Sequence, residues 1–171
     1  MATSFRNHLL AAGLLFFIYP HFAGAVEFGR FDGSDSALDA YIGKGKWVVV
    51  KIWAHDCSVC NTEAHEYVAF HNKHKDSDAV VLGISIDGQA KFEEAKKFLR
   101  RHKIPYTSLI GEPAAVAEFY QRKTGSPWIG TPTFIIYSPS GTLVAETVGA
   151  IPTTLIEQFM VEYAASRQRK N

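Results

Sequence analysis

The stretch KIWAHDCSVCNTEAHEY, from Lys51 to Tyr67, contains both cysteines of the 171-residue chain. Cys57 and Cys60 stand two residues apart, directly after an apolar run and at the start of a predicted helix. A Cys-x-x-Cys pair at that place puts both side chains on one helix face, one turn apart, within the Cα separation that a disulfide tolerates. The stretch therefore predicts dithiol redox chemistry.

The segments around this pair predict a β-α-β unit. The run 47–54, WVVVKIWA, is rich in β-branched and aromatic residues, which is typical of a central strand covered on both faces. A helix over 57–73 and a second buried strand over 79–87 complete the unit. Further along the chain, the patterns predict a helix over 89–102, a short strand near 107–110, a helix near 114–122, a hairpin over 133–149 and a closing helix over 153–166.

The first 25 residues have the pattern of a signal peptide. Arg6 lies in a short polar start, the apolar stretch runs from Leu9 to Tyr19, and the helix breaker Pro20 follows. We expect cleavage after Ala25 and export to the periplasm, an oxidising compartment in which disulfides persist. The alternative is an uncleaved anchor, although the apolar run is shorter than the roughly 20 residues that span a bilayer.

The remaining chain, 26–171, is predicted to form a single domain. Its hydrophobic content, 47% over the whole sequence, suits a compact core. Lys and Arg total 18 against 17 acidic residues, so we expect no nucleic-acid partner, and we expect a monomer. Near its beginning, Ser34 as a helix cap and Gly43 as a stop predict a brief helix.

The helix N-terminus favours a thiolate on Cys57, which makes this residue the nucleophile, while Cys60 is placed to attack the mixed disulfide. A purely structural disulfide would close a very small loop and stabilise little. A zinc site needs more ligands, and His71 and His74 are too closely spaced for the finger pattern. Haem attachment requires His directly after the second Cys, where Asn61 stands. No cofactor is expected.

The order strand, Cys-x-x-Cys, helix, strand and Thr-Pro-Thr resembles the thioredoxin superfamily. The segments WAHDCSVCNTE, VVLGISID and IGTPTFIIYSPSGTLV resemble its TlpA/ResA branch of secreted thiol-disulfide reductases, over roughly 26–160. The resemblance implies an α/β thioredoxin-like fold, with a central mixed β-sheet of four to five strands flanked by helices. It also implies a reactive Cys57, a resolving Cys60, and a cis peptide bond between Thr131 and Pro132.

Three residues are predicted to bind the substrate: Trp53, Thr131 and Pro132. We expect the backbone of Thr131 to pair with an extended client segment as an added strand. Such recognition reads little side-chain identity, so the sequence does not name the client.

Two carboxylates are candidates for adjusting the reactivity of the cysteine pair. Asp56 stands where the family usually has Trp, and a carboxylate beside Cys57 would raise the pKa of its thiol and favour the disulfide; alternatively, Asp56 points to solvent. Glu63 lies on one helical stripe with Cys60. In the ResA-like branch an acidic residue at this position lies under the cysteines, which implies proton exchange with Cys60. The alternative is an ordinary exposed Glu63.

The predicted function is a periplasmic thiol-disulfide oxidoreductase that reduces disulfides of secreted or membrane-associated clients. The family implies a membrane thiol transporter as electron donor. Two alternatives stay open: an oxidase or isomerase that donates its disulfide, and a copper-binding metallochaperone that uses the same cysteines. His55 and His65 flank the pair, but no metal site is predicted. A peroxiredoxin is not expected, because the Thr-x-x-Cys pattern would need Thr where Ala54 stands.

Overall fold

The computed structural model describes residues 28–169. The predicted signal peptide, 1–25, and its cleavage point lie outside these residues. Among the described helices, none combines the length and the apolar character that crossing a membrane requires.

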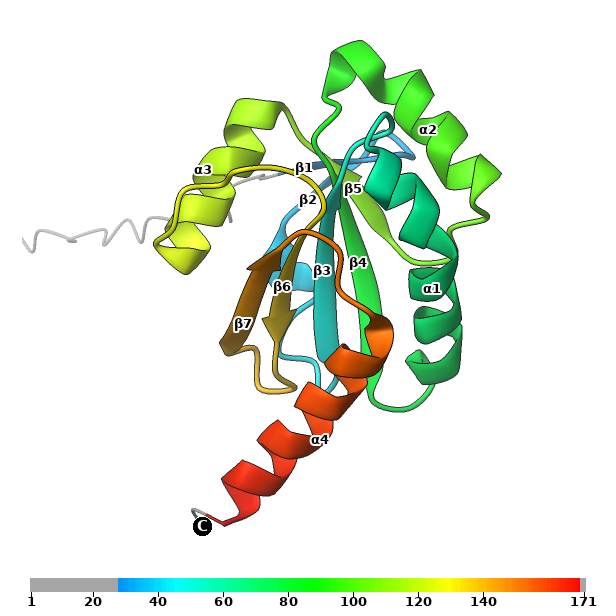
Figure 1. Ribbon diagram of the computed structural model, residues 1–171. Helices are drawn as coiled ribbons and strands as arrows, with labels where there is room; N and C mark the ends of the chain where they lie inside the picture. The colour runs from blue at the N-terminus through cyan, green and yellow to red at the C-terminus, as the bar shows by residue number, and fades with distance from the viewer. Residues whose placement is uncertain (1–27, 170–171) are drawn as a thin grey trace, which may run out of the picture.

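A seven-stranded mixed sheet forms the centre of the molecule (Figure 1). Its spatial order is β2-β1-β5-β4-β3-β6-β7, with β3, β4 and β5 parallel and every other neighbouring pair antiparallel. In chain order, the strands are β1 (Phe28–Arg30), β2 (Asp35–Ser36), β3 (Trp47–Trp53), β4 (Ala79–Ser85), β5 (Ser108–Ile110), β6 (Thr133–Tyr137) and β7 (Leu143–Val148).

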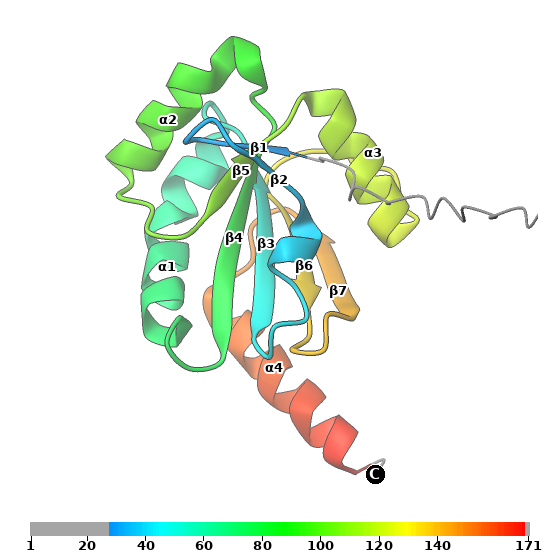
Figure 2. The ribbon, with the colours of Figure 1, turned by 180° about the vertical axis from the view of Figure 1, so that it is seen from behind.

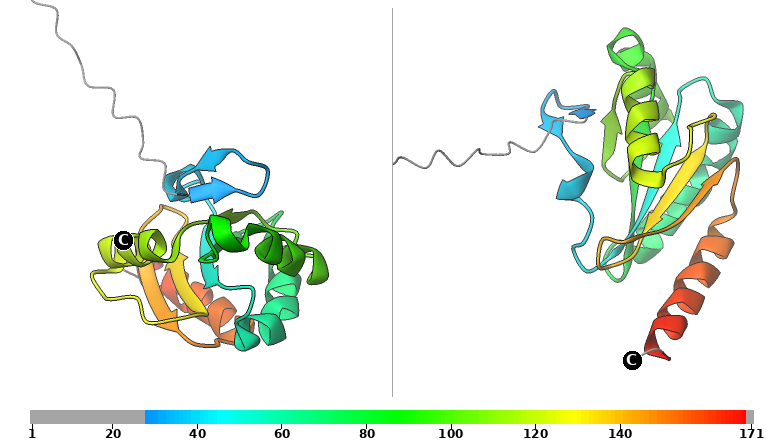
Figure 3. Two further views of the ribbon diagram at one scale, coloured as in Figure 1. Left: turned by 90° about the horizontal axis from the view of Figure 1, so that it is seen from above. Right: turned by 90° about the vertical axis from the view of Figure 1, so that its left-hand side faces the viewer.

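Helices cover both faces of this sheet. They are α1 (Ser58–His74), α2 (Phe92–Arg101), α3 (Pro113–Thr124) and α4 (Thr153–Gln168), with 3₁₀ turns η1 (Leu38–Ala40) and η2 (Gln89–Lys91). Helices α1 and α4 lie in front of the sheet in Figure 1, whereas α3 and the turn η1 lie on the other side (Figure 2). The right-hand view of Figure 3 shows these layers from the edge.

The central strand β3 has apolar side chains on both faces, so helices must cover both faces of the sheet. Val49 packs with residues of α1 and α4, whereas Val48 and Val50 pack with residues of α3 and η1. Every residue of β3 is buried, as a continuous apolar strand requires. The predicted β-α-β unit, the terminal hairpin and the closing helix are all confirmed.

Two predictions about the fold are wrong in detail. The sheet has seven strands instead of four to five, because β1 and β2 extend its edge beyond β5. The brief helix predicted between Ser34 and Gly43 is replaced by β2 and the turn η1. The hydroxyl and the backbone N–H of Ser34 both donate to Asp32 Oδ1, at 2.6 and 3.0 Å. This local turn uses the side chain that would have capped the helix.

The topology brings two loops to one end of the sheet. Strand β3 runs into the turn that carries Cys57, whose N–H donates to Ala54 O at 3.3 Å. Strand β6 is antiparallel to β3, with Thr133 opposite Ile52. The Thr131–Pro132 peptide bond, which is cis, therefore lies at the same end of the sheet as the cysteine pair.

Candidate active site

Cys57 and Cys60 form a disulfide, with their Cα atoms 5.2 Å apart. Cys57 is the N-cap of α1, and its Sγ accepts a hydrogen bond from the N–H of Cys60 at 3.1 Å. Cys57 is half-buried, whereas Cys60 is completely buried. Another protein can thus contact Cys57 but not Cys60.

A buried ion pair lies on the same helix face as Cys60. The Nζ atom of Lys51, in the middle of β3, is 2.9 Å from Glu63 Oε1 in α1, and the two side chains are 2% and 7% exposed. Lys51 Nζ also lies 4.4 Å from the centre of the Tyr67 ring. Beyond the ion pair and this ring contact, neither charged group has a hydrogen-bond partner among the described residues.

Burial shifts both members of this pair toward their neutral forms. It raises the pKa of Glu63, against the opposing effect of the nearby Lys51 ammonium, and it lowers the pKa of Lys51. Glu63 also helps to line a pocket of about 170 Å³, together with Val59 and Glu66, although both of its carboxylate oxygens are buried. Glu63 is therefore a buried carboxylate with a raised pKa, which suits it to accept a proton.

The predicted stripe on α1 is confirmed as a buried face, which includes Cys60, Glu63, Ala64, Tyr67 and Phe70. Lys51 is the partner that sequence reasoning missed. The signal was Lys51 itself, the one charged residue in the otherwise apolar strand β3, since a strand covered on both faces leaves a charged side chain no route to solvent.

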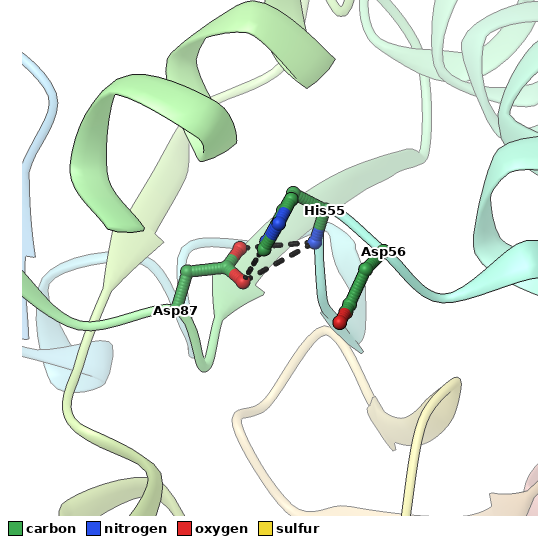
Figure 4. Close-up of side chains that lie close together, drawn as sticks. All are labelled: His55, Asp56 and Asp87. Atoms are coloured by element: carbon green, nitrogen blue, oxygen red, sulfur yellow. Dashed lines mark hydrogen bonds and ion pairs between the residues drawn. The ribbon is translucent and has the colours of Figure 1, made fainter. Parts of the chain in front are cut away.

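A second polar network fixes the turn before Cys57 (Figure 4). The buried carboxylate of Asp87 accepts hydrogen bonds from the backbone N–H of His55 at 3.0 Å and from the hydroxyl of Ser85 at 2.6 Å, and it lies 2.6 Å from His55 Nδ1. Asn61 Nδ2 donates to the carbonyl oxygens of His55 and Cys57. These contacts hold the backbone of the reactive turn from two sides.

His55, Asp56 and Asp87 place potential metal-ligand atoms within 4.8 Å of one another. The Asp87 oxygens are already occupied by the hydrogen bonds within this network, and Asp56 is exposed. His65, the other histidine near the pair, is exposed, and its Nδ1 lies 2.9 Å from Thr62 O. The exposure of Asp56 agrees with the alternative in which it points to solvent, and its influence on Cys57 stays a prediction.

The structure corrects the role predicted for Trp53. This side chain is 1% exposed and stacks on Phe98 with ring centres 4.3 Å apart. It therefore belongs to the core beneath the cysteine pair and has no exposed surface that a client could contact. Pro132 is buried and Thr131 is half-buried, and no hydrogen bond to the backbone N–H or C=O of Thr131 occurs within residues 28–169. Direct client contact at Thr131 and Pro132 stays a prediction.

A thioredoxin-like sheet whose central strand leads into a disulfide at a helix N-terminus defines a thiol oxidoreductase. Comparison with known proteins agrees with this class. The chain belongs to the AhpC/TSA family, whose model matches residues 19–146.

Individual relatives come from two groups. The chain is 30% identical to peroxiredoxin Bcp of Bacillus subtilis over 111 residues. This alignment covers 60% of this chain and 68% of the relative. The thioredoxin domain of a thiol-disulfide oxidoreductase from Bacteroides vulgatus is 25% identical, with a TM-score of 0.63 over 80% of this chain and 96% of that one. A secreted disulfide oxidoreductase from Mycobacterium tuberculosis, 19% identical, has a TM-score of 0.57 over 81% and 93% of the chains and shows the shared fold.

Proposed function

We propose that the protein reduces disulfide bonds in exported client proteins, through the cysteine pair of the AhpC/TSA thioredoxin-like fold. The observation that carries this proposal is the contrast between the two cysteines. Cys57 is half-buried at the N-cap of α1, whereas Cys60 is fully buried, on the same helix face as Glu63 of the Lys51–Glu63 ion pair. Cys57 can be contacted by another protein, whereas Cys60 can react only with Cys57.

In the reduced protein, the thiolate of Cys57 attacks one sulfur of the client disulfide. The client S–S bond breaks, its second sulfur leaves as a thiolate, and a mixed disulfide with Cys57 forms. The N-terminal N–H groups of α1 stabilise the negative charge on Cys57 before attack, including the N–H of Cys60 that donates to its Sγ.

Cys60 then completes the transfer. Its thiol must lose a proton before it can attack Cys57 Sγ, and the carboxylate of Glu63 is the proton acceptor in our proposal. Formation of the Cys57–Cys60 bond releases the second client thiolate, so the pair has given two electrons to the client. Lys51 keeps Glu63 ionised between turnovers, because burial without a counter-ion would protonate it.

The location and the electron source are part of this proposal. The N-terminal pattern of the sequence supports export, and structural neighbours include a secreted oxidoreductase. In such a compartment a membrane dithiol transporter would supply the two electrons that return the Cys57–Cys60 disulfide to the dithiol. The reaction needs no cofactor, because in each step the two electrons move directly between sulfur atoms.

The two cysteine roles can be tested with a disulfide-containing peptide and the reduced protein. Cys57→Ser is expected to abolish turnover, whereas Cys60→Ser is expected to accumulate a mixed disulfide detectable by its mass, since only Cys60 can resolve it. Each variant retains one cysteine, so the adduct has a single possible site. Normal turnover by Cys60→Ser would show that the assigned roles are wrong.

A second candidate is peroxide reduction, which the 30% identity to peroxiredoxin Bcp favours. Cys57 would be oxidised to a sulfenic acid by the peroxide, and Cys60 would condense with it to give the same disulfide and water. Ala54 stands where the Thr of the peroxidase pattern is expected. Consumption of hydrogen peroxide, measured with the same reductant and protein as the peptide assay, separates the two activities.

A further inference from the structure

Positive charge is concentrated beside the reactive turn. Residues 95–111 contain five Lys and Arg residues and no Asp or Glu, in a chain whose totals are 18 basic and 17 acidic residues. The segment begins after the two glutamates in the first turn of α2, Glu93 and Glu94, and continues through the rest of α2, the loop that follows it and β5. Such a local excess in a nearly neutral chain creates a field that a partner can detect.

The fold turns these charges outward. Ala95 and Phe98 are buried against α1 and the sheet, so the opposite side of α2 faces solvent. Four exposed basic side chains follow this outer side and the turn after it, and we call them the basic ridge: Lys97, Arg100, Arg101 and Lys103.

Hydrogen bonds connect the basic ridge to the cysteine pair. Arg101 Nη2 donates to Asn61 Oδ1 at 2.5 Å, and His102 Nε2 lies 2.9 Å from the same oxygen. The amide nitrogen of Asn61 donates in turn to Cys57 O at 2.9 Å. One end of the basic ridge is therefore connected by two hydrogen bonds to the backbone carbonyl of the nucleophilic cysteine.

Ion pairs within the described residues leave most of the basic ridge unpaired, although Glu93 and Glu94 stand in the first turn of the same helix. Lys97, Arg100 and Lys103 form no ion pair with any of the residues from 28 to 169. The helix dipole favours positive charge in the last turn of α2, which accounts for Arg100 and Arg101. It does not account for Lys97, one turn earlier, or for Lys103, beyond the helix end.

We propose that the basic ridge binds an acidic stretch next to the disulfide of a client protein. This inference rests on the proposed reductase function and adds a substrate class to it. Backbone pairing at Thr131 would read little side-chain identity. The four cations of the ridge, of which Arg101 is connected to Cys57 through Asn61, would distinguish clients by charge. The ridge would raise the rate of encounter with acidic clients without taking part in the sulfur chemistry.

The test uses two peptides that share one disulfide loop, flanked by a run of Asp residues in one and of Ser residues in the other. For the wild-type protein we expect kcat/KM about tenfold higher for the acidic peptide at low salt, with the preference lost near 0.5 M salt, where screening is strong. The double variant Lys97→Ser/Arg100→Ser is expected to lose the preference and keep its rate with the Ser peptide.

A matched control removes the same charge elsewhere. Lys44, before β3, and Arg167, near the end of α4, are both exposed, and Lys44→Ser/Arg167→Ser should retain the preference. Equal wild-type rates with the two peptides, or an unchanged preference in the ridge variant, would overturn the proposal.

Binding of the two labelled peptides to the oxidised protein, followed by fluorescence anisotropy, makes this test independent of turnover. If neither peptide is reduced but the acidic one binds through the ridge, the reductase function fails and the binding surface stands. Ridge-dependent flotation with phosphatidylglycerol vesicles, without binding of the acidic peptide, would instead assign the ridge to a membrane and contradict our proposal.

Discussion

At the scale of single residues, the site depends on a charged pair in an apolar environment. Lys51 and Glu63 are 2.9 Å apart and almost completely buried, one from the central strand and one from the helix that carries the cysteines. Removing one partner leaves an uncompensated buried charge, whereas replacing both by apolar residues is often tolerated. Comparing a single variant with a double variant therefore separates the effect of the pair on stability from its effect on catalysis.

We predict that Lys51→Met lowers the free energy of unfolding by about 3–5 kcal/mol. Without the ammonium, the already raised pKa of Glu63 rises further, so Glu63 accepts a proton from Cys60 only at higher pH. The pH–rate profile of mixed-disulfide resolution should therefore move to higher pH. Urea denaturation and stopped-flow measurements check the two effects.

The variant Lys51→Met/Glu63→Met supplies the control. It should recover most of the lost stability, because no buried charge remains, yet resolve the mixed disulfide slowly at every pH, because it has no proton acceptor. The exposed Lys44→Met should change neither property. A double variant with a normal pH–rate profile would show that Glu63 does not accept the proton of Cys60.

Some of these residues could be predicted and others could not. The N-cap position of Cys57 and the inward direction of Glu63 follow from helical spacing, which is a local property. The Lys51–Glu63 and His55–Asp87 pairs join different elements, and Asp87 lies 32 residues after His55. Such contacts arise only when β3, α1 and β4 pack together, so no local pattern contains them.

At the scale of elements, α4 is attached to α1 by a charged cluster. His74 Nδ1 lies 2.8 Å from Asp78 and Nε2 lies 2.9 Å from Glu157 in α4, which also pairs with Lys73. Burial lowers the pKa of His74, but the hydrogen bonds to Glu157 and Asp78 outweigh it, and the pKa is raised above its usual range. The same contacts lower the pKa of Glu157.

The sign of these shifts predicts how stability depends on pH. A raised pKa in the folded state stabilises below the unfolded value of about 6.5, and the contribution disappears as pH rises through the folded value. We therefore expect His74→Gln to lower Tm by about 2–4 °C near pH 6, for a loss of about 1 kcal/mol, and by less near pH 8.5. Thermal unfolding followed by circular dichroism measures both values.

The exposed His65 provides the comparison, since His65→Gln should leave Tm unchanged at either pH. A loss of Tm in His74→Gln that is the same at pH 6 and pH 8.5 would mean that His74 acts by packing against Phe70, with ring centres 4.6 Å apart, and not through its charge.

The elements also show where sequence patterns stop being informative. Strands β3 and β4, with seven residues each, and helix α1, with 17, are long enough for periodicity to identify. Strands β1 and β2 have three and two residues and exist because the edge of β5 is available for pairing. Their hydrogen bonds depend on a sheet that is already assembled. The sequence of two or three residues therefore could not predict these strands.

At the scale of the whole molecule, the topology gathers the chemistry at one end of the sheet. The reactive turn after β3, the Thr131–Pro132 loop before β6 and the end of α2 that bears the basic ridge come from distant parts of the sequence. The hydrophobic core fixes the cysteine pair from below through Trp53 and Phe98.

The central claim is that the cysteine pair gives electrons to clients. Equilibration of the Cys57–Cys60 couple with defined ratios of reduced and oxidised glutathione, at neutral pH, measures its reduction potential directly. A client reductase requires a potential well below about −200 mV, and this is the value we predict. A potential near about −120 mV would contradict the account, because the protein would then donate its disulfide to clients instead of reducing theirs.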